Sequence, residues 1–399
     1  MKRVAIIGTA GVPGRYGGFE TLAHQLVTHL NDQCQLTVYC SKKVYPKHER
    51  PNTWQGARLV YLPFDANGVQ SIIYDIVSII HALFYADALI VLGVSGGICL
   101  PFIKRLTSKK IIVNIDGLEW RRPKWKKWVR QYLKWSERLA VRHSHADITD
   151  NYAIQRYTAQ QYKTNSILIE YGGNHASRQP MTKAALAQYP FLRMPYAFSV
   201  CRIEPENNVH MVLEAFASQP KKQLVFVGNW HNSPYGKELL NTYANKPNLH
   251  LLPPIYDQVQ LDILRSNCHV YLHGHSAGGT NPSLVEAMCL GLPVVAFDVA
   301  YNQYTTENSA LYFKNTSQLV HILTNTSLQH YQQVASNLKQ IANRRYVWAV
   351  IANKYKTLVL AFDHKYRKKP VGTLLSRFNY TRLKKLGLTH FMFQRHFYE

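Results

Sequence analysis

The stretch that decides the fold reads His273-Gly274-His275-Ser276-Ala277-Gly278-Gly279-Thr280-Asn281-Pro282-Ser283-Leu284-Val285-Glu286-Ala287-Met288, followed by Gly291-Leu292-Pro293-Val294-Val295. An apolar strand ends near Leu272, and a loop of glycines and hydroxyl side chains comes next. Pro282 marks the start of a helix, because its fixed φ suits the first helical position. A second apolar strand follows the helix. This order of strand, loop, helix and strand is typical of a parallel sheet covered by helices.

The loop before this helix predicts an anion-binding site. Free amides and the dipole at a helix N-terminus attract phosphate groups. We expect a diphosphate to be held by Gly279, Thr280, Asn281 and the amides of Ser283 and Leu284. Glu286, one turn into the helix, would accept hydrogen bonds from a ribose. The alternative is structural: Thr280 or Asn281 only caps the helix, and Glu286 only favours its dipole.

The same alternation extends over most of the chain. The first series of strands is expected at residues 3–8, 36–39, 59–62, 88–92, 111–115, 147–149 and 167–170, with helices at 19–30, 72–84 and 125–143. The second series is expected at 198–200, 224–228, 249–252, 270–272, 294–297 and 311–313, with long helical character at 329–362. This predicts an α/β protein of two Rossmann-like, doubly wound parallel-sheet domains that face each other across a ligand-binding cleft. We place the domains at residues 1–180 and 195–362, followed by a basic tail, 363–399.

A glycine-rich turn joins the first strand to the first helix, at residues 8–20. Gly17 and Gly18 would let backbone amides approach a phosphate, and Arg15 and Tyr16 would face the ligand. The glycine spacing matches neither the dinucleotide fingerprint nor the P-loop. Glycines that serve only tight turns, and surface side chains at Arg15 and Tyr16, are the alternative.

The chain carries a formal net charge of +24, which predicts attraction to nucleic acid, an anionic bilayer or diphosphates. Residues 120–135 combine tryptophans at helical spacing with Lys and Arg, as membrane-surface helices do. This segment contributes Trp120, Arg121, Trp125, Lys126 and Trp128 as candidate membrane and acceptor residues. The alternative is that the tryptophans face the core. Residues 69–92 are interrupted by charged and polar groups, so we expect a buried helix and a strand there, and no membrane span.

These motifs resemble family 4 of the glycosyltransferases, over most of the chain. The resemblance is carried by Gly17–Glu20, Cys201–Asn208 and Pro282–Val295. It implies the GT-B fold and a retaining transfer that needs neither metal ion nor cofactor. Residues 12–21, 114–122 and 202–208 look like the bacterial rhamnosyltransferase-like subgroup. That subgroup implies dTDP-rhamnose as donor, an undecaprenyl-diphosphate-linked saccharide as acceptor, and capsule or O-antigen assembly at the cytoplasmic face of the inner membrane.

Two positions depart from the wider family. The family has two glutamates around the diphosphate-binding turn; Glu286 matches the second, but Gly278 stands at the first. The family also clamps the diphosphate with Arg and Lys. Arg202 matches the arginine, whereas Asn207 or Asn208 stands where the lysine would be, so one cation of the clamp is missing.

Asp116 is the candidate catalytic group, because it follows a buried-looking strand at its carboxyl end. A histidine is common in that neighbourhood in the family, so Asp116 would orient the acceptor or take its proton. Arg202 would stabilise the departing diphosphate. Glu119 is a second catalytic candidate and Asn151 an acceptor contact; both have structural alternatives.

The sequence also allows other functions. A UDP- or GDP-sugar donor would keep the fold and the mechanism. A sugar-nucleotide 2-epimerase shares the fold but requires acidic residues around the donor sugar. A nucleic-acid-binding protein suits the charge, but no recognition motif for nucleic acid is present. A catalytically inactive scaffold would explain the two departures.

Overall fold

The computed structural model describes residues 1–15, 17–115, 117–122 and 125–361. These residues form two compact units: residues 1–170 together with 352–361, and residues 171–351. Two predicted site residues, Tyr16 and Asp116, and the basic tail at 363–399 lie outside the described residues.

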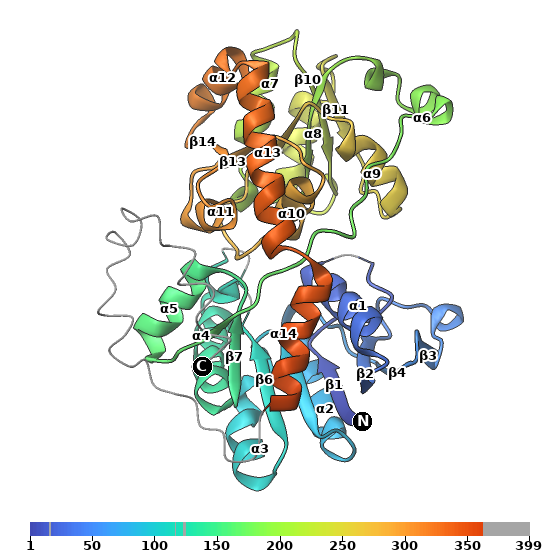
Figure 1. The fold of residues 1–399 in the computed structure, drawn as a ribbon, viewed down its shortest axis with the longest axis vertical. Coiled ribbons are helices and arrows are strands. Elements are labelled where there is room, and N and C mark those ends of the chain that lie inside the picture. The colour runs from blue at the N-terminus through green and yellow to red at the C-terminus, as the bar shows by residue number, and fades with distance from the viewer. Residues whose placement is uncertain (16, 116, 123–124, 362–399) are drawn as a thin grey trace. The chain divides into compact units, whose positions relative to one another are not determined.

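The first unit is built on an eight-stranded sheet in the order β3-β4-β2-β1-β5-β6-β7-β8 (Figure 1). Every pairing is parallel except that of β3 with β4. The central strands are buried on both faces, which explains their continuous apolar sequences. The strands are β1 (Lys2–Ile7), β2 (Cys34–Ser41), β3 (Thr53–Trp54), β4 (Ala57–Leu62), β5 (Ala88–Leu92), β6 (Lys110–Asn114), β7 (Ala146–Thr149) and β8 (Ile167–Leu168).

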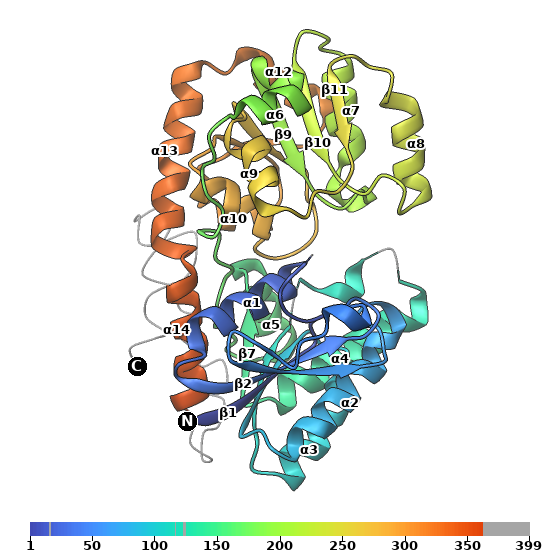
Figure 2. The ribbon, with the colours of Figure 1, turned by 90° about the vertical axis from the view of Figure 1, so that its right-hand side faces the viewer.

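Helices cover both faces of this sheet. Figure 2 shows α2, α3 and α4 on one side of the unit, with α14 on the other. The helices are α1 (Gly18–Leu30), α2 (Ser71–Leu83), α3 (Leu100–Leu106), α4 (Lys127–His143) and α5 (Tyr152–Tyr162), together with most of α14 (Trp348–Ala361).

The second unit has a six-stranded sheet in the order β11-β10-β9-β12-β13-β14, with every pair of neighbours parallel. Its strands are β9 (Tyr196–Val200), β10 (Gln223–Val227), β11 (Leu249–Leu252), β12 (Val270–His273), β13 (Val294–Phe297) and β14 (Leu311–Phe313). Its helices are α6 (Lys183–Gln188), α7 (Val209–Ala217), α8 (Pro234–Tyr243), α9 (Gln258–Ser266), α10 (Pro282–Cys289), α11 (Ala300–Thr305), α12 (Thr316–Asn325) and α13 (Leu328–Arg345). The predicted α/β class with two parallel-sheet domains is confirmed.

The last described helix differs from the sequence-based expectation. Long helical character was expected at 329–362 within the second domain, and the structure has two helices there: α13 ends at Arg345 and α14 begins at Trp348. Most of α14 packs in the first unit. The hydroxyl of Tyr355 accepts a hydrogen bond from Asn114 Nδ2 at 2.8 Å, and Lys354 Nζ pairs with Glu170 Oε2 at 3.3 Å. These contacts place residues 352–361 with the first unit.

Candidate functional site

Three loops of the second unit are tied together at the carboxyl ends of β9, β12 and β13. Ser276, in the loop after β12, donates from its amide and its hydroxyl to the carbonyl of Glu206, each over 2.8 Å. Asn302 Nδ2, in α11 after β13, donates to the carbonyl of His275 at 2.9 Å. Ligands of parallel sheets bind at this edge. The predicted donor residues of the second unit are therefore gathered at one place.

Arg202 and the two asparagines lie in the loop after β9. The side chain of Arg202 is exposed, so its guanidinium is available to an anion. Asn207 Nδ2 donates to the carbonyl of Arg202 at 2.7 Å, and Asn208 Nδ2 donates to the carbonyl of Gly274 at 2.8 Å. Both asparagines are buried. Their amides hold the loops, so in this structure neither replaces the missing lysine at a diphosphate.

Helix α10 begins where it was predicted to begin, but its first amides are not free. Pro282 is the first helical residue, and Asn281 caps the helix by accepting from the amide of Ser283 at 3.2 Å. The amide of Leu284 donates to the carbonyl of Asn281 at 3.1 Å. We expected the amides of Ser283 and Leu284 to be free for a diphosphate, and this was wrong, because the cap already occupies both.

The loop before α10 keeps room for a ligand at Gly278. Its φ of +133° is a conformation that other residues rarely adopt, and a Cβ there would meet no atom within 4 Å. Gly279, the next residue, is half-buried, whereas Thr280 is buried. Of the residues predicted to hold the diphosphate, this open glycine segment and the Arg202 guanidinium are accessible to a ligand.

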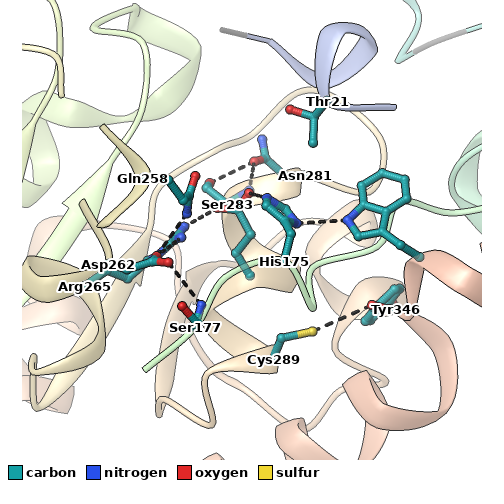
Figure 3. A network of polar contacts seen from close by, with 12 residues as sticks. Thr21, His175, Ser177, Gln258, Asp262, Arg265, Asn281, Ser283, Cys289 and Tyr346 are labelled. Atoms are coloured by element: carbon teal, nitrogen blue, oxygen red, sulfur yellow. Dashed lines mark hydrogen bonds and ion pairs between the residues drawn. The ribbon is translucent and has the colours of Figure 1, made fainter. Parts of the chain in front are cut away.

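Glu286 belongs to a buried ionic network, whose members His175, Asp262 and Arg265 are labelled in Figure 3. Its Oε2 pairs with Arg265 Nη1, and its Oε1 lies 3.0 Å from His175 Nε2. Arg265 is fully buried on α9 and also pairs through Nη2 with Asp262 Oδ1 at 2.5 Å. Gln258 Nε2 and the amide of Ser177 donate to Asp262 at 3.1 and 3.0 Å.

The network keeps Glu286 ionised. Burial alone raises the pKa of this carboxyl, but attraction to Arg265 and the hydrogen bond from His175 outweigh burial and lower the pKa to about 2. Burial lowers the pKa of Arg265, yet Glu286 and Asp262 together raise it above the usual value. Each oxygen of Glu286 has a second acceptor site besides the one in use. A fixed carboxylate of this kind can accept hydrogen bonds from the hydroxyls of a ribose.

His273, at the end of β12, is buried and its ring stacks on that of His275, with centroids 4.3 Å apart. Burial lowers the pKa of His273 to about 3, so its ring is neutral near pH 7. His273 therefore adds no positive charge to the predicted diphosphate site at that pH.

The glycine turn of the first unit contacts helix α1 and the segment at residues 44–49. The amide of Ala10 donates to Glu20 Oε1 at 2.9 Å, and that of Gly14 donates to His24 Nδ1 at 3.2 Å. Arg15 forms an ion pair with Glu49 and lies over the ring of Tyr45, 4.7 Å from its centroid. Gly17 and Gly18 stand at the start of α1, as predicted. The contact with Glu49 favours a structural role for Arg15.

Glu119 and Asn151 have structural tasks in this structure. Glu119 Oε2 pairs with Arg122 Nε at 2.7 Å, and its Oε1 accepts from Trp125 Nε1 at 3.0 Å. Asn151 caps α5 by accepting from the amide of Ala153 at 2.9 Å. These contacts support the structural alternatives for both residues.

The tryptophan-rich segment is only partly a helix. Helix α4 begins at Lys127, so Trp125 lies before it, and the expected start at residue 125 was wrong. Trp128 and Trp135 are 56% and 48% exposed. Lys126, the N-cap of α4, is also exposed.

Trp120 is half-buried and lies among cations. Lys134 Nζ is 4.7 Å from the centroid of a Trp120 ring, and Arg121 is at 5.2 Å. Arg130 Nε also donates to the carbonyl of Trp120 at 3.0 Å. Trp120 and Arg121 therefore belong to a packed cation–aromatic cluster, whereas Trp128 and Trp135 present their rings outward.

Four residues of this network were not predicted from the sequence: His175, Asp262, Arg265 and Trp348. The indole Nε1 of Trp348 lies 2.9 Å from His175 Nδ1. His175 follows no motif, and Trp348 is distant in sequence. The one available signal was the spacing of Asp262 and Arg265, which lets opposite charges meet on one helix face. The described residues contain no group of three or more His, Cys, Asp or Glu that could hold a metal ion. Among the described helices, none has the length and apolarity needed to cross a bilayer.

Two family models match the chain. Residues 188–318 match "Glycosyl transferases group 1", and residues 1–174 match "Domain of unknown function (DUF1972)". The second unit thus carries a glycosyltransferase group 1 domain, which agrees with the predicted resemblance at the level of the domain.

Known proteins with similar sequence or fold point the same way. A glycosyltransferase 1 domain-containing protein from Xenopus tropicalis is 23% identical over 171 residues, 40% of this chain, and the match spans about half (49%) of that protein. The structure of a sucrose-phosphate synthase from Thermosynechococcus elongatus superposes with a TM-score of 0.73 at 16% identity, over 91% of this chain and 100% of the other. HepE from Anabaena, solved in complex with UDP-glucose, gives 0.69 at 16% identity, with the same coverage. These likenesses show the GT-B fold.

Proposed function

We propose that this chain is a retaining glycosyltransferase that needs no metal ion and moves a sugar from a nucleoside diphosphate onto a saccharide acceptor. The observation that carries the proposal is Glu286, held ionised on α10 behind the open glycine loop of a group 1 glycosyltransferase domain. A buried network of this kind fixes a carboxylate for hydrogen bonding to a ligand.

In the proposed reaction, the acceptor hydroxyl attacks on the face from which the diphosphate departs, so the anomeric configuration is retained. The Arg202 guanidinium stabilises the charge that develops on the leaving diphosphate, and Glu286 holds the ribose. Asp116, outside the described residues, is proposed to orient the acceptor or take its proton.

For the donor we propose dTDP-rhamnose. The support is the resemblance of residues 12–21, 114–122 and 202–208 to the rhamnosyltransferase-like subgroup. The similar fold of HepE, whose structure contains UDP-glucose, supports a nucleotide sugar in general and makes a UDP-sugar the second candidate.

For the acceptor we propose an undecaprenyl-diphosphate-linked saccharide at the cytoplasmic face of the inner membrane, in capsule or O-antigen assembly. The exposed Trp128 and Trp135 on the cationic helix α4 support a membrane-surface enzyme.

A donor panel tests the proposal: dTDP-rhamnose, UDP-glucose, UDP-GlcNAc and GDP-mannose, each with labelled sugar and membrane extract as acceptor source. Selective movement of rhamnose into a lipid-extractable product is expected. Selective use of another donor would contradict rhamnosyl transfer but keep the reaction class. Failure with every donor would contradict the activity itself.

A further inference from the structure

The outer side of helix α2 is apolar. Ile73 and Ile80 are 50% and 49% exposed, and Phe84, directly after the helix, is 84% exposed. The only acidic residue of α2, Asp75, is buried, and the helix contains no Lys or Arg. A surface helix normally turns polar residues to water. We expected this helix to be buried, and that was wrong for its outer side.

Helices α3 and α4 continue the same kind of surface. Phe102 and Leu106 of α3 are 66% and 76% exposed and lie one turn apart. On α4, Trp128 and Trp135 are exposed at a spacing of two turns. Val69, two residues before α2, is also exposed. With it, half of the large hydrophobic side chains that are exposed in the described chain lie on or beside these three helices.

The three helices meet around one turn on the same side of the first unit. The turn at Gly96 and Gly97 lies between α2 and α4, and α3 follows it directly. A Cβ on Gly96 would come within 2.9 Å of Asp75 Cβ on α2, and one on Gly97 within 2.4 Å of the Ser136 carbonyl oxygen on α4. The hydroxyl of Tyr132 on α4 also donates to the carbonyl of Ser95 at 2.7 Å. Figure 2 shows α2, α3 and α4 on the same side of the unit.

The charge of this face has one sign. Helices α2, α3 and α4 contain two acidic residues, Asp75 and Glu137, and both are buried. Their exposed charged side chains are all cationic: Lys104, Arg105, Lys127, Arg130, Lys134, Arg138 and Arg142. Exposed aromatic and aliphatic groups interspersed with cations are what an anionic lipid surface attracts.

We propose that the outer face of α2, α3 and α4, called the helix face below, docks on an anionic phospholipid bilayer. This inference rests on the proposed function, because a lipid-linked acceptor must be reached at a membrane. The helix face would lie in the boundary layer between the lipid headgroups and the acyl chains. Its Phe, Leu, Ile and Trp side chains would enter the upper acyl chains, and its Arg and Lys side chains would contact lipid phosphates. Helix α2 has 13 residues, too few to span a bilayer.

Other occupants fit the helix face less well. A second copy of the chain would bring cations against cations. The tail at 363–399 is itself rich in Lys and Arg, so like-charge repulsion disfavours it as a cover. Nucleic acid suits the cations but gains little from exposed Ile73, Ile80 and Leu106, because bases and phosphates offer them no apolar medium.

Co-sedimentation of the full chain with vesicles tests the proposal. The vesicles are phosphatidylcholine alone, or phosphatidylcholine mixed with phosphatidylglycerol. One variant combines Phe84→Ser, Phe102→Ser and Leu106→Ser, and a second combines Arg105→Gln, Arg138→Gln and Arg142→Gln. We expect the wild type to prefer the anionic vesicles. Loss of three cations should lower partitioning on the order of a hundredfold, and the apolar variant should lose binding to both kinds of vesicle.

Two matched variants in the second unit serve as controls. Met194→Ser, Val259→Ser and Leu328→Ser remove side chains that are 54%, 55% and 72% exposed, and Lys221→Gln, Lys237→Gln and Lys246→Gln remove exposed cations. Melting curves establish that all variants fold. Unchanged vesicle binding in both helix-face variants, or an equal loss in the controls, would overturn the proposal. Helix-face variants that lose binding to an oligonucleotide but still bind vesicles would also overturn it.

Donor hydrolysis without membranes separates this inference from the proposed function. Folded helix-face variants should hydrolyse the donor at the wild-type rate, since their substitutions lie on the outer side of the first unit. A wild type that binds anionic vesicles but uses no donor would contradict the proposed function and leave the docking surface standing.

Discussion

The indole Nε1–H of Trp348 donates a hydrogen bond to Nδ1 of His175 over 2.9 Å. A ring nitrogen that accepts a hydrogen bond carries no proton, so in the neutral ring the proton lies on Nε2. Nε2 is 3.0 Å from Oε1 of Glu286 and donates to it. Trp348 therefore selects the histidine tautomer that orients the carboxylate proposed to hold the ribose.

Replacing Trp348 by Phe should weaken nucleotide binding, because His175 loses the partner that fixes its tautomer. The loss of one hydrogen bond is worth about 1 kcal/mol, or about a fivefold rise in the dissociation constant. Calorimetric titration with a nucleoside diphosphate measures it, and the melting temperature reports any separate loss of packing.

The matched control is Tyr235→Phe, in the same unit. It removes a tyrosine hydroxyl that lies 2.8 Å from Nδ1 of His210. Nucleotide affinity should stay at the wild-type value in this control. An equal loss in both variants would show that the His175 contact has no particular effect on the ligand.

The ionic network predicts a specific acid sensitivity. The pKa of Glu286 falls from 4.5 to about 2 in the folded protein. A depressed pKa stabilises the folded state at pH values above the ordinary one, and this contribution is lost as the pH falls from about 4.5 towards 2. Urea unfolding across that window should show the free energy of unfolding decreasing as protons bind.

Glu286→Gln isolates this contribution, since the amide does not titrate. The variant should be less stable than the wild type near pH 7, because buried Arg265 loses one of its two acidic partners. Its stability should also change less between pH 4.5 and 2. Parallel pH profiles for the two proteins would show that Glu286 is not the titrating group.

The predicted fold follows from local patterns that the structure retains. The bounds of β5, β11, β13 and β14 agree with the expected strands, because each is a short apolar run between turn residues. Strand β3 was missed, since its two residues form no pattern and depend on pairing with β4. The outer side of α2 was also missed, because an apolar pattern does not distinguish burial in a core from exposure at a membrane.

The site could be predicted only where its residues lie in one continuous segment. Pro282 and Asn281 are at their expected positions because helix capping is local. Arg265 and His175 meet Glu286 only after α9 and the segment before α6 pack against α10, so no spacing reveals them. The roles expected for Asn207 and Asn208 gave way to loop contacts that the resemblance did not predict.

Arg202→Ala should lower turnover without loss of stability. The side chain is exposed, so folding should be little affected, whereas loss of one stabilising donor in a transition state costs about 3–4 kcal/mol. Initial rates at saturating donor measure the change. Arg193→Ala, an exposed arginine of the same unit, is the control, and a wild-type rate in Arg202→Ala would remove its proposed role.

Chelation tests the proposed independence from metal ions. Arg202 and the loop before α10 are proposed to stabilise the diphosphate by themselves, so turnover should be the same after dialysis against EDTA as before it. Added Mg²⁺ or Mn²⁺ should not raise the rate. A loss of activity on chelation, restored by one of these ions, would show that a cation takes the place of the missing lysine.

Asp116→Asn should separate donor binding from transfer. Asp116 lies outside the described residues, and its role is inferred from its place after β6 and from the family resemblance. The amide keeps the size of the side chain but can neither take a proton nor carry charge, so transfer to the lipid-linked acceptor should fall at least a hundredfold, as for loss of a general base (~10²–10⁴). Nucleotide affinity should stay at the wild-type value. Transfer at a near wild-type rate would make Asp116 structural, and parallel loss of affinity and transfer would assign it to the donor site.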